Sequence, residues 1–114
     1  MNQQEIVWVS LPFSSLEESK VRPAVIISNN EYNTKSQDVI VCAITSKLEE
    51  KQYSIIIDSK NLSQGKLSLK SRIRADKVMQ IEKNLILKSF AQLNNKTFDA
   101  LINEIIKLIR RAKF

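Results

Sequence analysis

Short apolar runs of four to six residues, each bounded by polar or Pro-containing segments, constrain the fold of this chain more than any other feature. Runs of this length and spacing are typical of buried β-strands. Val39–Ile44 is the most apolar run and is therefore expected to lie inside the sheet. The expected strands are Ile6–Val9 (ended by Pro12), Pro23–Ile27, Val39–Ile44, Tyr53–Ile57 and Ser71–Val78.

The segments between these runs are polar or charged, which is typical of loops. Gly65 is the only glycine of the chain, and it indicates a loop or turn. Lys83–Gln92 has no clear period, and a short helix and a turn both remain open there. The expected connections are Ser14–Lys20, Asn30–Asp38, Lys47–Gln52 and Asn61–Lys66.

The last segment of the chain has the spacing of an amphipathic helix. Its apolar residues recur at i, i+3, i+4, i+7, i+8 and i+11, which places them on one helical face. They are Phe98, Leu101, Ile102, Ile105, Ile106 and Ile109. Asn94, Asn95 and Thr97 are candidates for the helix cap. Several short strands and one terminal helix predict a mostly-β, α+β fold, a small twisted sheet or barrel with a helix against it.

Length and composition narrow the classes of protein. A chain of 114 residues fits one domain, residues 1–114. Without histidine there is no Ser-His or Cys-His nucleophile, and the single cysteine makes neither an internal disulfide nor a zinc site. No apolar run approaches the 18 or so residues of a membrane span, and Met1–Ile6 does not resemble a signal peptide. We therefore expect a cytoplasmic protein that does not enter a membrane.

Positive charge is concentrated in the second half of the chain. Residues 1–65 carry 6 Lys/Arg and 8 Asp/Glu, whereas residues 66–114 carry 12 Lys/Arg and 4 Asp/Glu. A basic half indicates an anionic partner, most simply a nucleic acid. A solvated basic surface explains the same charge and is favoured when charge is considered alone.

Two arginine motifs are candidates for chemistry. Pro23 holds Arg22 in extended backbone, where the planar guanidinium suits a phosphate. The spacing alone favours a simpler role, an ion pair with Glu17 or Glu18. In the second motif, strand alternation places Arg72, Arg74 and Asp76 on one face and Ile73 and Ala75 on the other, toward a core. These three charged residues suit phosphate binding and proton transfer, and a surface ion pair is again the favoured alternative.

Thr45 and Ser46 form a hydroxyl pair at the end of the most apolar strand. Strand ends are frequent functional positions, although a strand-terminating Thr-Ser pair has no specificity by itself. Trp8 and Cys42 lie within apolar runs and are expected in the core.

Taken in order, these segments resemble the MazF/PemK family of bacterial toxin endoribonucleases over nearly the whole chain. The matching segments are Glu5–Leu11, the Arg-Pro strand Val21–Asn29, Val39–Ser46 with its Ile-Thr-Ser ending, and Ser71–Lys83. The resemblance implies a small SH3-like barrel of the CcdB/PemK type, usually a homodimer. It also implies metal-independent cleavage of single-stranded RNA without a cofactor, and a cognate antitoxin as partner.

The resemblance also assigns roles to residues. Arg22 matches the family arginine that clamps the phosphate, and Thr45 matches the hydroxyl residue that works with it. Arg74 and Asp76 match the Arg-x-Asp pair of the PemK branch, with Asp76 as the base. No residue is assigned to a metal. The residues expected to bind RNA are Lys20, Ser46, Arg72 and Lys77.

The chain departs from the family pattern at two places. The segment before Arg22 lacks the usual glycines, with Leu16 near the place of a PemK-branch histidine, and Met79-Gln80 stands where Arg-Thr is common. The alternative function is a non-catalytic binder on the same barrel, either an RNA-binding relative or a CcdB-like toxin that targets gyrase. The chain ends Ala112-Lys113-Phe114 and lacks the Trp-Gly-Ile-like ending associated with gyrase poisoning.

Overall fold

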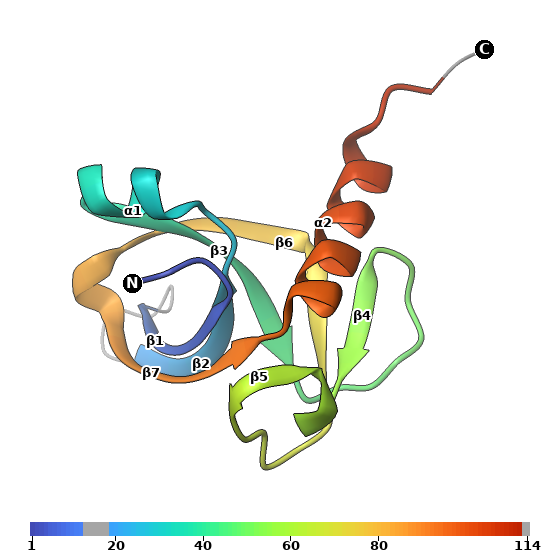
Figure 1. Ribbon diagram of the computed structural model, residues 1–114, viewed down its shortest axis with the longest axis horizontal. Helices are drawn as coiled ribbons and strands as arrows, with labels where there is room; N and C mark the ends of the chain where they lie inside the picture. Colours follow the sequence, from blue (N-terminus) through green and yellow to red (C-terminus); the bar gives the residue numbers. More distant parts are fainter. Residues whose placement is uncertain (13–18, 113–114) are drawn as a thin grey trace.

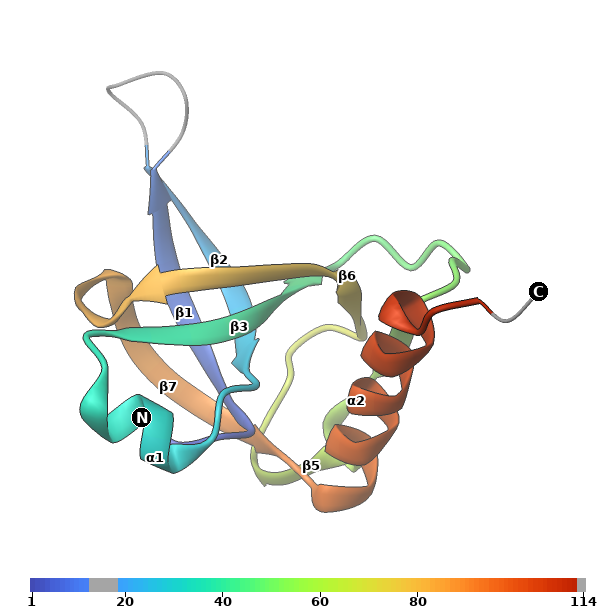
Figure 2. The ribbon, with the colours of Figure 1, turned by 90° about the horizontal axis from the view of Figure 1, so that it is seen from above.

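The computed structural model describes residues 1–12 and 19–112, which form strands, two α-helices and short 3₁₀ turns (Figures 1 and 2). The strands are β1 (Glu5–Pro12), β2 (Ser19–Ile26), β3 (Asp38–Thr45), β4 (Ser54–Ile57), β5 (Leu62–Gly65), β6 (Ser71–Glu82) and β7 (Ile86–Leu93). The helices are α1 (Asn30–Lys35) and α2 (Asn95–Ile109), and the 3₁₀ turns are Ser59–Asn61 and Lys83–Leu85.

The described strands pair antiparallel in one sheet, in the order β4-β6-β3-β2-β1-β7-β5. β3 has β2 and β6 as neighbours, which confirms the expectation that the most apolar run lies inside the sheet. The sheet curls round on itself, and α2 stands outside the curl against β6 and β4 (Figure 1). This architecture confirms the predicted mostly-β, barrel-like fold with a C-terminal amphipathic helix.

The strands bury apolar side chains on both faces. One cluster lies in the curl of the sheet and includes Val7, Val9 and Ile26. The other lies beneath α2, where Phe98 and Leu101 meet Ile6 and other strand residues. A fully buried leucine such as Leu101 stabilises the fold by about 1.5–3 kcal/mol. Burial on both faces explains why the strands are nearly continuous apolar runs.

Three connections differ from the sequence expectation. Asn30–Asp38 is not an irregular connection, because α1 forms there with the Asn29 side chain accepting from the Tyr32 backbone N–H at 2.8 Å. Lys83–Gln92 is mostly strand β7 after one 3₁₀ turn. Within Asn61–Lys66, the residues Leu62–Gly65 form β5 by pairing with β7. A local cap supports α1, whereas β5 and β7 have a weak local pattern and form through pairing with other strands.

Strand boundaries also extend beyond the apolar runs. β1 continues to Pro12, and β6 continues to Glu82 because β3 pairs along its length. Lys20, placed by the sequence in a loop, lies in β2. Ser19, also placed in that loop, begins β2. The other residues of the expected loop, 14–18, lie outside the described residues.

Trp8 is not a core residue, contrary to the sequence expectation. Its exposed fraction is 36%, and its ring stacks on Phe90 with centroids 4.9 Å apart and planes 20° apart. Register shifts in the β1–β7 pairing flank this position, and Trp8 lies outside the cluster beneath α2. Cys42 is fully buried, as predicted.

The terminal helix begins as the sequence predicts. The Asn94 side chain accepts from the Thr97 backbone N–H at 2.8 Å and caps the first turn. Its apolar face is buried at Phe98 and Leu101, yet Ile106 and Ile109 are exposed near the end. The same apolar stripe therefore changes from core to surface along the helix. Within the described residues, no helix is both long and apolar enough to cross a bilayer.

Candidate functional site

Three neighbouring strands, β2, β3 and β6, carry the predicted residues. The described pairing of β2 with β3 ends at Ala24 opposite Ala43. Arg22 and Thr45 each lie two residues beyond this last pair. Thr45 pairs with Arg72 of β6. Directly opposed residues share a face of the sheet, so Thr45 and Arg72 lie on the same surface.

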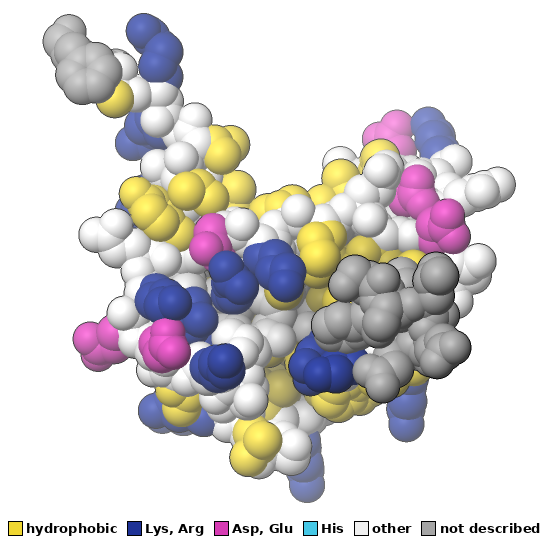
Figure 3. All heavy atoms as spheres, turned by 180° about the vertical axis from the view of Figure 1, so that it is seen from behind, with side chains coloured by type: hydrophobic (Ala, Val, Ile, Leu, Met, Phe, Trp, Pro, Cys, Tyr) yellow, Lys and Arg dark blue, Asp and Glu magenta, His cyan; other side chains and the backbone are white. Residues whose placement is uncertain are grey.

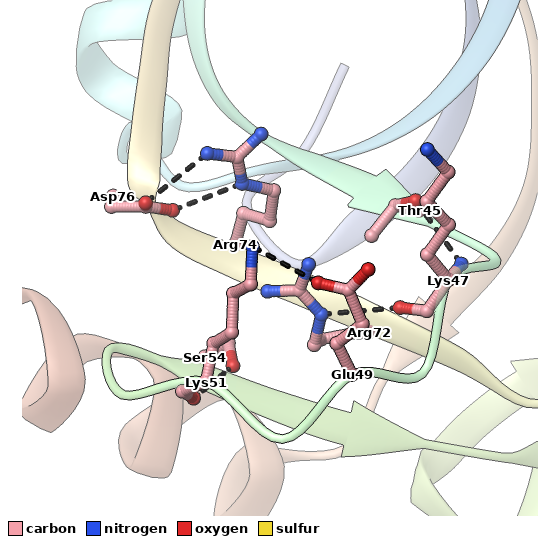
Figure 4. A network of polar contacts seen from close by, with 8 residues as sticks. All are labelled: Thr45, Lys47, Glu49, Lys51, Ser54, Arg72, Arg74 and Asp76. Carbon is pink, nitrogen blue, oxygen red and sulfur yellow. Dashed lines mark hydrogen bonds and ion pairs between the residues drawn. The ribbon is translucent and has the colours of Figure 1, made fainter.

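Arg74 and Asp76 form an ion pair on β6 (Figure 4). Arg74 Nε donates to Asp76 Oδ1 and Arg74 Nη2 donates to Asp76 Oδ2, both at 3.1 Å. This bidentate hydrogen bonding is the main reason that the pKa of Asp76 is lowered from its ordinary value. The same bonds raise the pKa of Arg74. The Asp76 carboxylate is therefore ionised at neutral pH.

The side chains predicted to point from β6 toward the core are buried, but one of those predicted on the polar face is buried as well. Ile73 and Ala75 are fully buried. Arg72 was expected to project with Arg74 and Asp76, but it is only 5% exposed. Its Nε donates to the backbone oxygen of Lys47 at 3.2 Å. Arg72 is held under the connection between β3 and β4 because its guanidinium finds an acceptor there.

The other predicted RNA-binding residues lie at the surface. Ser46 directly follows β3, Lys77 follows Asp76 in β6, and Lys20 lies in β2; all three are exposed, as is Arg22. The carboxylates suggested as partners for Arg22, Glu17 and Glu18, lie outside the described residues. The face shown in Figure 3 carries several Lys and Arg side chains among fewer Asp and Glu side chains.

Cys42 is close to the site but is unsuited to nucleophilic chemistry. Burial, and to a lesser extent the charge of Asp76, raises the pKa of its thiol to about 12. A thiol with this pKa is protonated at neutral pH and is not a nucleophile. Among the described residues, no group of three or more Cys, Asp or Glu side chains is arranged to hold a metal ion.

Residues 46–53, between β3 and β4, border this site. The sequence predicted a connection at Lys47–Gln52 but not its contacts with β6. Lys47 supplies the acceptor for Arg72, and the Tyr53 carbonyl accepts from the Ala75 backbone N–H at 2.9 Å. The sequence shows a charged run in this segment, but it carries no signal for where that run contacts β6. A charged residue inside a strand, such as Arg72, is the one local hint, because it needs an acceptor when buried.

Comparison with known proteins places this arrangement in a family. The Staphylococcus saprophyticus protein named Endoribonuclease MazF is 29% identical over 94 residues, which cover 82% of this chain and 78% of that protein. A MazE–MazF crystal structure from Deinococcus radiodurans superposes with a TM-score of 0.81 at 15% identity, covering 98% of this chain and 97% of the other. A mycobacterial endoribonuclease solved in complex with its cognate antitoxin gives a TM-score of 0.77 at 15% identity, covering 99% of each chain.

At these identities, the two structures establish the fold. The family itself is established by the sequence model described as PemK-like, MazF-like toxin of type II toxin–antitoxin system, which matches residues 2–109. The match includes both arginine motifs and the terminal helix. The chain therefore belongs to the PemK-like, MazF-like family of toxins of type II toxin–antitoxin systems.

Proposed function

We propose that this protein is a sequence-specific, metal-independent endoribonuclease that cleaves single-stranded mRNA and acts as the toxin of a toxin–antitoxin system. The observation that carries the proposal is the Arg74–Asp76 ion pair on β6, the strand with which Thr45 pairs. Its membership of the toxin family and its likeness to a protein named as an endoribonuclease support the same activity.

The reaction uses a nucleophile that belongs to the substrate. The RNA 2′-oxygen attacks the adjacent phosphorus, the bond from phosphorus to the 5′-oxygen breaks, and the products are a 2′,3′-cyclic phosphate and a 5′-hydroxyl. Asp76 takes the proton from the 2′-hydroxyl, and the leaving 5′-oxygen takes a proton from a solvent water on the opposite side of the phosphate. A positioned acid or base contributes about 10²–10⁴-fold to the rate.

Cations and a hydroxyl stabilise the charge that develops on the phosphate. Arg22 binds the phosphate, Thr45 or Ser46 donates to a non-bridging oxygen, and Arg74 stabilises the crowded phosphorane. The role of arginine is electrostatic because its pKa is too high for easy proton donation. In the described structure Arg74 is bonded to Asp76. When a phosphate draws Arg74 away, the pKa of Asp76 rises and the carboxylate becomes a better base.

Binding of the RNA backbone extends beyond the reacting phosphate. Lys20, Ser46 and Lys77 are exposed around the site and are proposed to contact RNA. Arg72, the fourth predicted contact, is buried, and its role in RNA binding stays a prediction. Each phosphate contact made by a lysine or arginine adds to the salt dependence of binding.

The proposed partners are a cognate antitoxin and a second copy of the chain. An acidic, partly disordered antitoxin segment complements the +6 net charge of the protein. The exposed apolar residues at the end of α2, Ile106, Leu108 and Ile109, support a homodimer. The proposal places the protein in the cytoplasm, where its mRNA substrate is found.

Cleavage of a long single-stranded RNA in EDTA by wild-type protein and by Arg22→Ala tests the proposed function. We expect wild-type cleavage at a short recurring sequence that leaves a cyclic phosphate. Arg22→Ala is expected to reduce the rate by at least about 10²-fold, since it removes a phosphate-stabilising cation. Because Arg22 is exposed, the melting temperature of the Arg22→Ala protein should stay within about 2 °C of wild type.

Lys96→Ala is the matched control, because Lys96 is an exposed cation in the first turn of α2. It should cleave like wild type. Full activity of Arg22→Ala would remove that residue from the mechanism. Intact RNA with folded wild-type protein, free of any antitoxin, would instead favour the binding-only alternative, an RNA-binding relative or a gyrase-targeting toxin.

A further inference from the structure

Residues 46–53, called here the β3–β4 loop, are tied to β6 on both sides of Arg74. At the first side, the buried Arg72 donates Nε to the Lys47 carbonyl oxygen at 3.2 Å. At the second side, the Tyr53 carbonyl accepts from the Ala75 backbone N–H at 2.9 Å. The loop is therefore bonded to β6 at Arg72, two residues before Arg74, and at Ala75, one residue after it.

The backbone of Tyr53 adopts a conformation that side chains rarely take. Its φ angle is 60°, in the left-handed region that costs an L-residue roughly 1–2 kcal/mol. This conformation directs the Tyr53 carbonyl to Ala75, and β4 pairing with β6 begins at the next residue, Ser54. The strain is therefore stored where the loop joins β6, next to the Arg74–Asp76 pair.

Contacts within the loop fix its shape (Figure 4). The Lys47 backbone N–H donates to Thr45 Oγ1 at 3.2 Å, and Ser54 Oγ donates to the Lys51 carbonyl at 2.7 Å. Glu49 and Lys51 form an ion pair at 3.0 Å. The loop is thus shaped before any substrate arrives.

The charges of the loop lie close enough to those of β6 to affect them. The pKa of Glu49 is lowered mainly by Lys51 and also by Lys47 and Arg72. Arg72 also contributes to lowering the pKa of Asp76. The buried Arg72 donates to the Lys47 carbonyl oxygen, and the charges of Glu49 and Asp76 act on it from a distance, so the protein itself compensates this cation without an RNA phosphate.

We infer that the β3–β4 loop is a preformed wall of the RNA site and that Arg72 is the positioning residue that holds it against β6. Arg72 acts on RNA through the loop and not through a phosphate. The wall stands beside Arg74 and carries Lys47, Glu49 and Lys51, whose charged side chains meet the nucleotides next to the scissile phosphate. The inference rests on the proposed function, since it names a residue that controls which RNA the site accepts.

Hydrogen exchange of the protein without RNA tests the position of the loop directly. In Arg72→Met, backbone amides of residues 46–53 and of Ala75 should exchange about tenfold faster, because a charged hydrogen bond is lost. Arg72→Lys should behave like Arg72→Met, because a lysine keeps the charge but has no planar Nε donor. Unchanged loop exchange in Arg72→Met overturns the inference. Since no cleavage is measured, this result stands even if the protein is not a nuclease.

Cleavage measurements on the same variants separate positioning from phosphate contact. A positioning role predicts that both variants lose selectivity between preferred and other RNA sequences by about tenfold, with the salt dependence of KM unchanged. Lys77→Met, a proposed phosphate contact, should instead reduce the salt slope by about 1. A reduced slope in Arg72→Met, together with rescue by Arg72→Lys, overturns the inference in favour of direct phosphate binding.

A second pair of variants tests the loop without disturbing a buried charge. Tyr53→Asn and Tyr53→Val both remove the ring, but only asparagine tolerates a positive φ. Tyr53→Val should accelerate exchange across the loop and reduce selectivity, whereas Tyr53→Asn should keep both closer to wild type. Equal behaviour of the two variants would contradict the role of the Tyr53 backbone. Lys88→Met, an exposed change on β7, is the neutral control.

Discussion

At the scale of single residues, Arg74 sets the charge state of Asp76 by bonding to both of its carboxylate oxygens. The lowered pKa of Asp76 keeps the carboxylate ionised, and it also makes Asp76 a weaker base in the free protein. The pair is partly exposed, so it contributes little to stability and its main effect is on the charge state of Asp76. A carboxylate whose basicity rises only when a phosphate binds Arg74 is consistent with a reaction that depends on RNA.

Replacing Arg74 should raise the pKa of Asp76. We expect the Asp76 carboxyl to titrate at a higher pH in Arg74→Met than in the wild-type protein, because the variant lacks the two hydrogen bonds from Arg74. Carbon NMR of the side-chain carboxyl during a pH titration measures both values. Since the folded pKa is lowered, the pair stabilises the fold above the unfolded pKa, and this is lost as pH falls through the folded pKa.

Arg111→Met, an exposed change beyond α2, is the control and should leave the Asp76 titration as in wild type. An unshifted Asp76 titration in Arg74→Met would show that the ion pair does not form in solution. The pH dependence of kcat/KM should follow the same order, with the acid limb of Arg74→Met at higher pH than that of wild type.

At the scale of elements, the short edge strand β5 depends on one glycine. Gly65 has a φ angle of 82° and lies opposite Ala91 of β7. A Cβ at this position would lie 2.3 Å from the Phe90 carbonyl oxygen and 2.7 Å from the Ala91 Cα, which are both backbone atoms. Such contacts cannot be relieved by a side-chain rotation, so the strand itself would have to move.

We expect Gly65→Ala to destabilise the protein by about 2–3 kcal/mol through the combined clash and backbone strain. A thermal melt should show a decrease of roughly 8–15 °C for a domain of this size. Ser63→Ala, an exposed change in the same strand, is the control and should melt close to wild type. A Gly65→Ala protein as stable as wild type would mean that β5 is not paired to β7 as described.

Element prediction from the sequence succeeded where one pattern dominated. Phe98, Leu101 and Ile105 repeat with a helical period, and α2 forms around them. It failed for β7, in which Lys88, Ser89 and Gln92 interrupt the apolar pattern and only pairing with β1 and β5 stabilises the strand. It also failed for Trp8, because a large apolar side chain in a strand does not reveal whether another element covers it.

The sequence also indicated the candidate site residues, but not the contacts between them. Arg22, Thr45, Arg74 and Asp76 were selected from the sequence through strand motifs and through family resemblance. That Thr45 pairs with Arg72 depends on the β3–β6 register, and that Arg72 is buried depends on the β3–β4 loop. Neither contact is a property of local sequence, because each joins residues that are more than twenty positions apart.

At the scale of the whole molecule, α2 leaves part of its apolar stripe without a partner. Phe98 and Leu101 lie in the core, whereas Ile106 and Leu108 are exposed and Ile109 is 73% exposed. The helix extends beyond the strands that it contacts, and its end projects away from the sheet (Figure 1). An apolar end of this kind suits association with a second copy of the chain, as the proposed homodimer requires.

We expect Ile109→Asp to weaken self-association by at least about 10²-fold, because a symmetric interface loses the burial of two isoleucines and gains two buried charges. Analytical ultracentrifugation over a concentration series measures the change. Leu69→Asp is the matched control, since Leu69 is also an exposed apolar residue but lies outside α2. A wild-type protein that stays monomeric, or an Ile109→Asp protein that associates equally well, would contradict this use of the helix.

The sequence by itself determined the strand-forming runs, the terminal helix, the family and the set of residues capable of the chemistry. The runs and the helix follow from local periodicity and residue type, which a linear chain carries directly, whereas the family and the candidate residues follow from the resemblance of the strand motifs. Only the tertiary structure decided that Thr45 pairs with Arg72, that Arg72 is buried under the β3–β4 loop, that Trp8 is exposed and that the end of α2 is exposed. The physical reason is that register, burial and loop docking depend on contacts between distant segments, which form only when the sheet has curled.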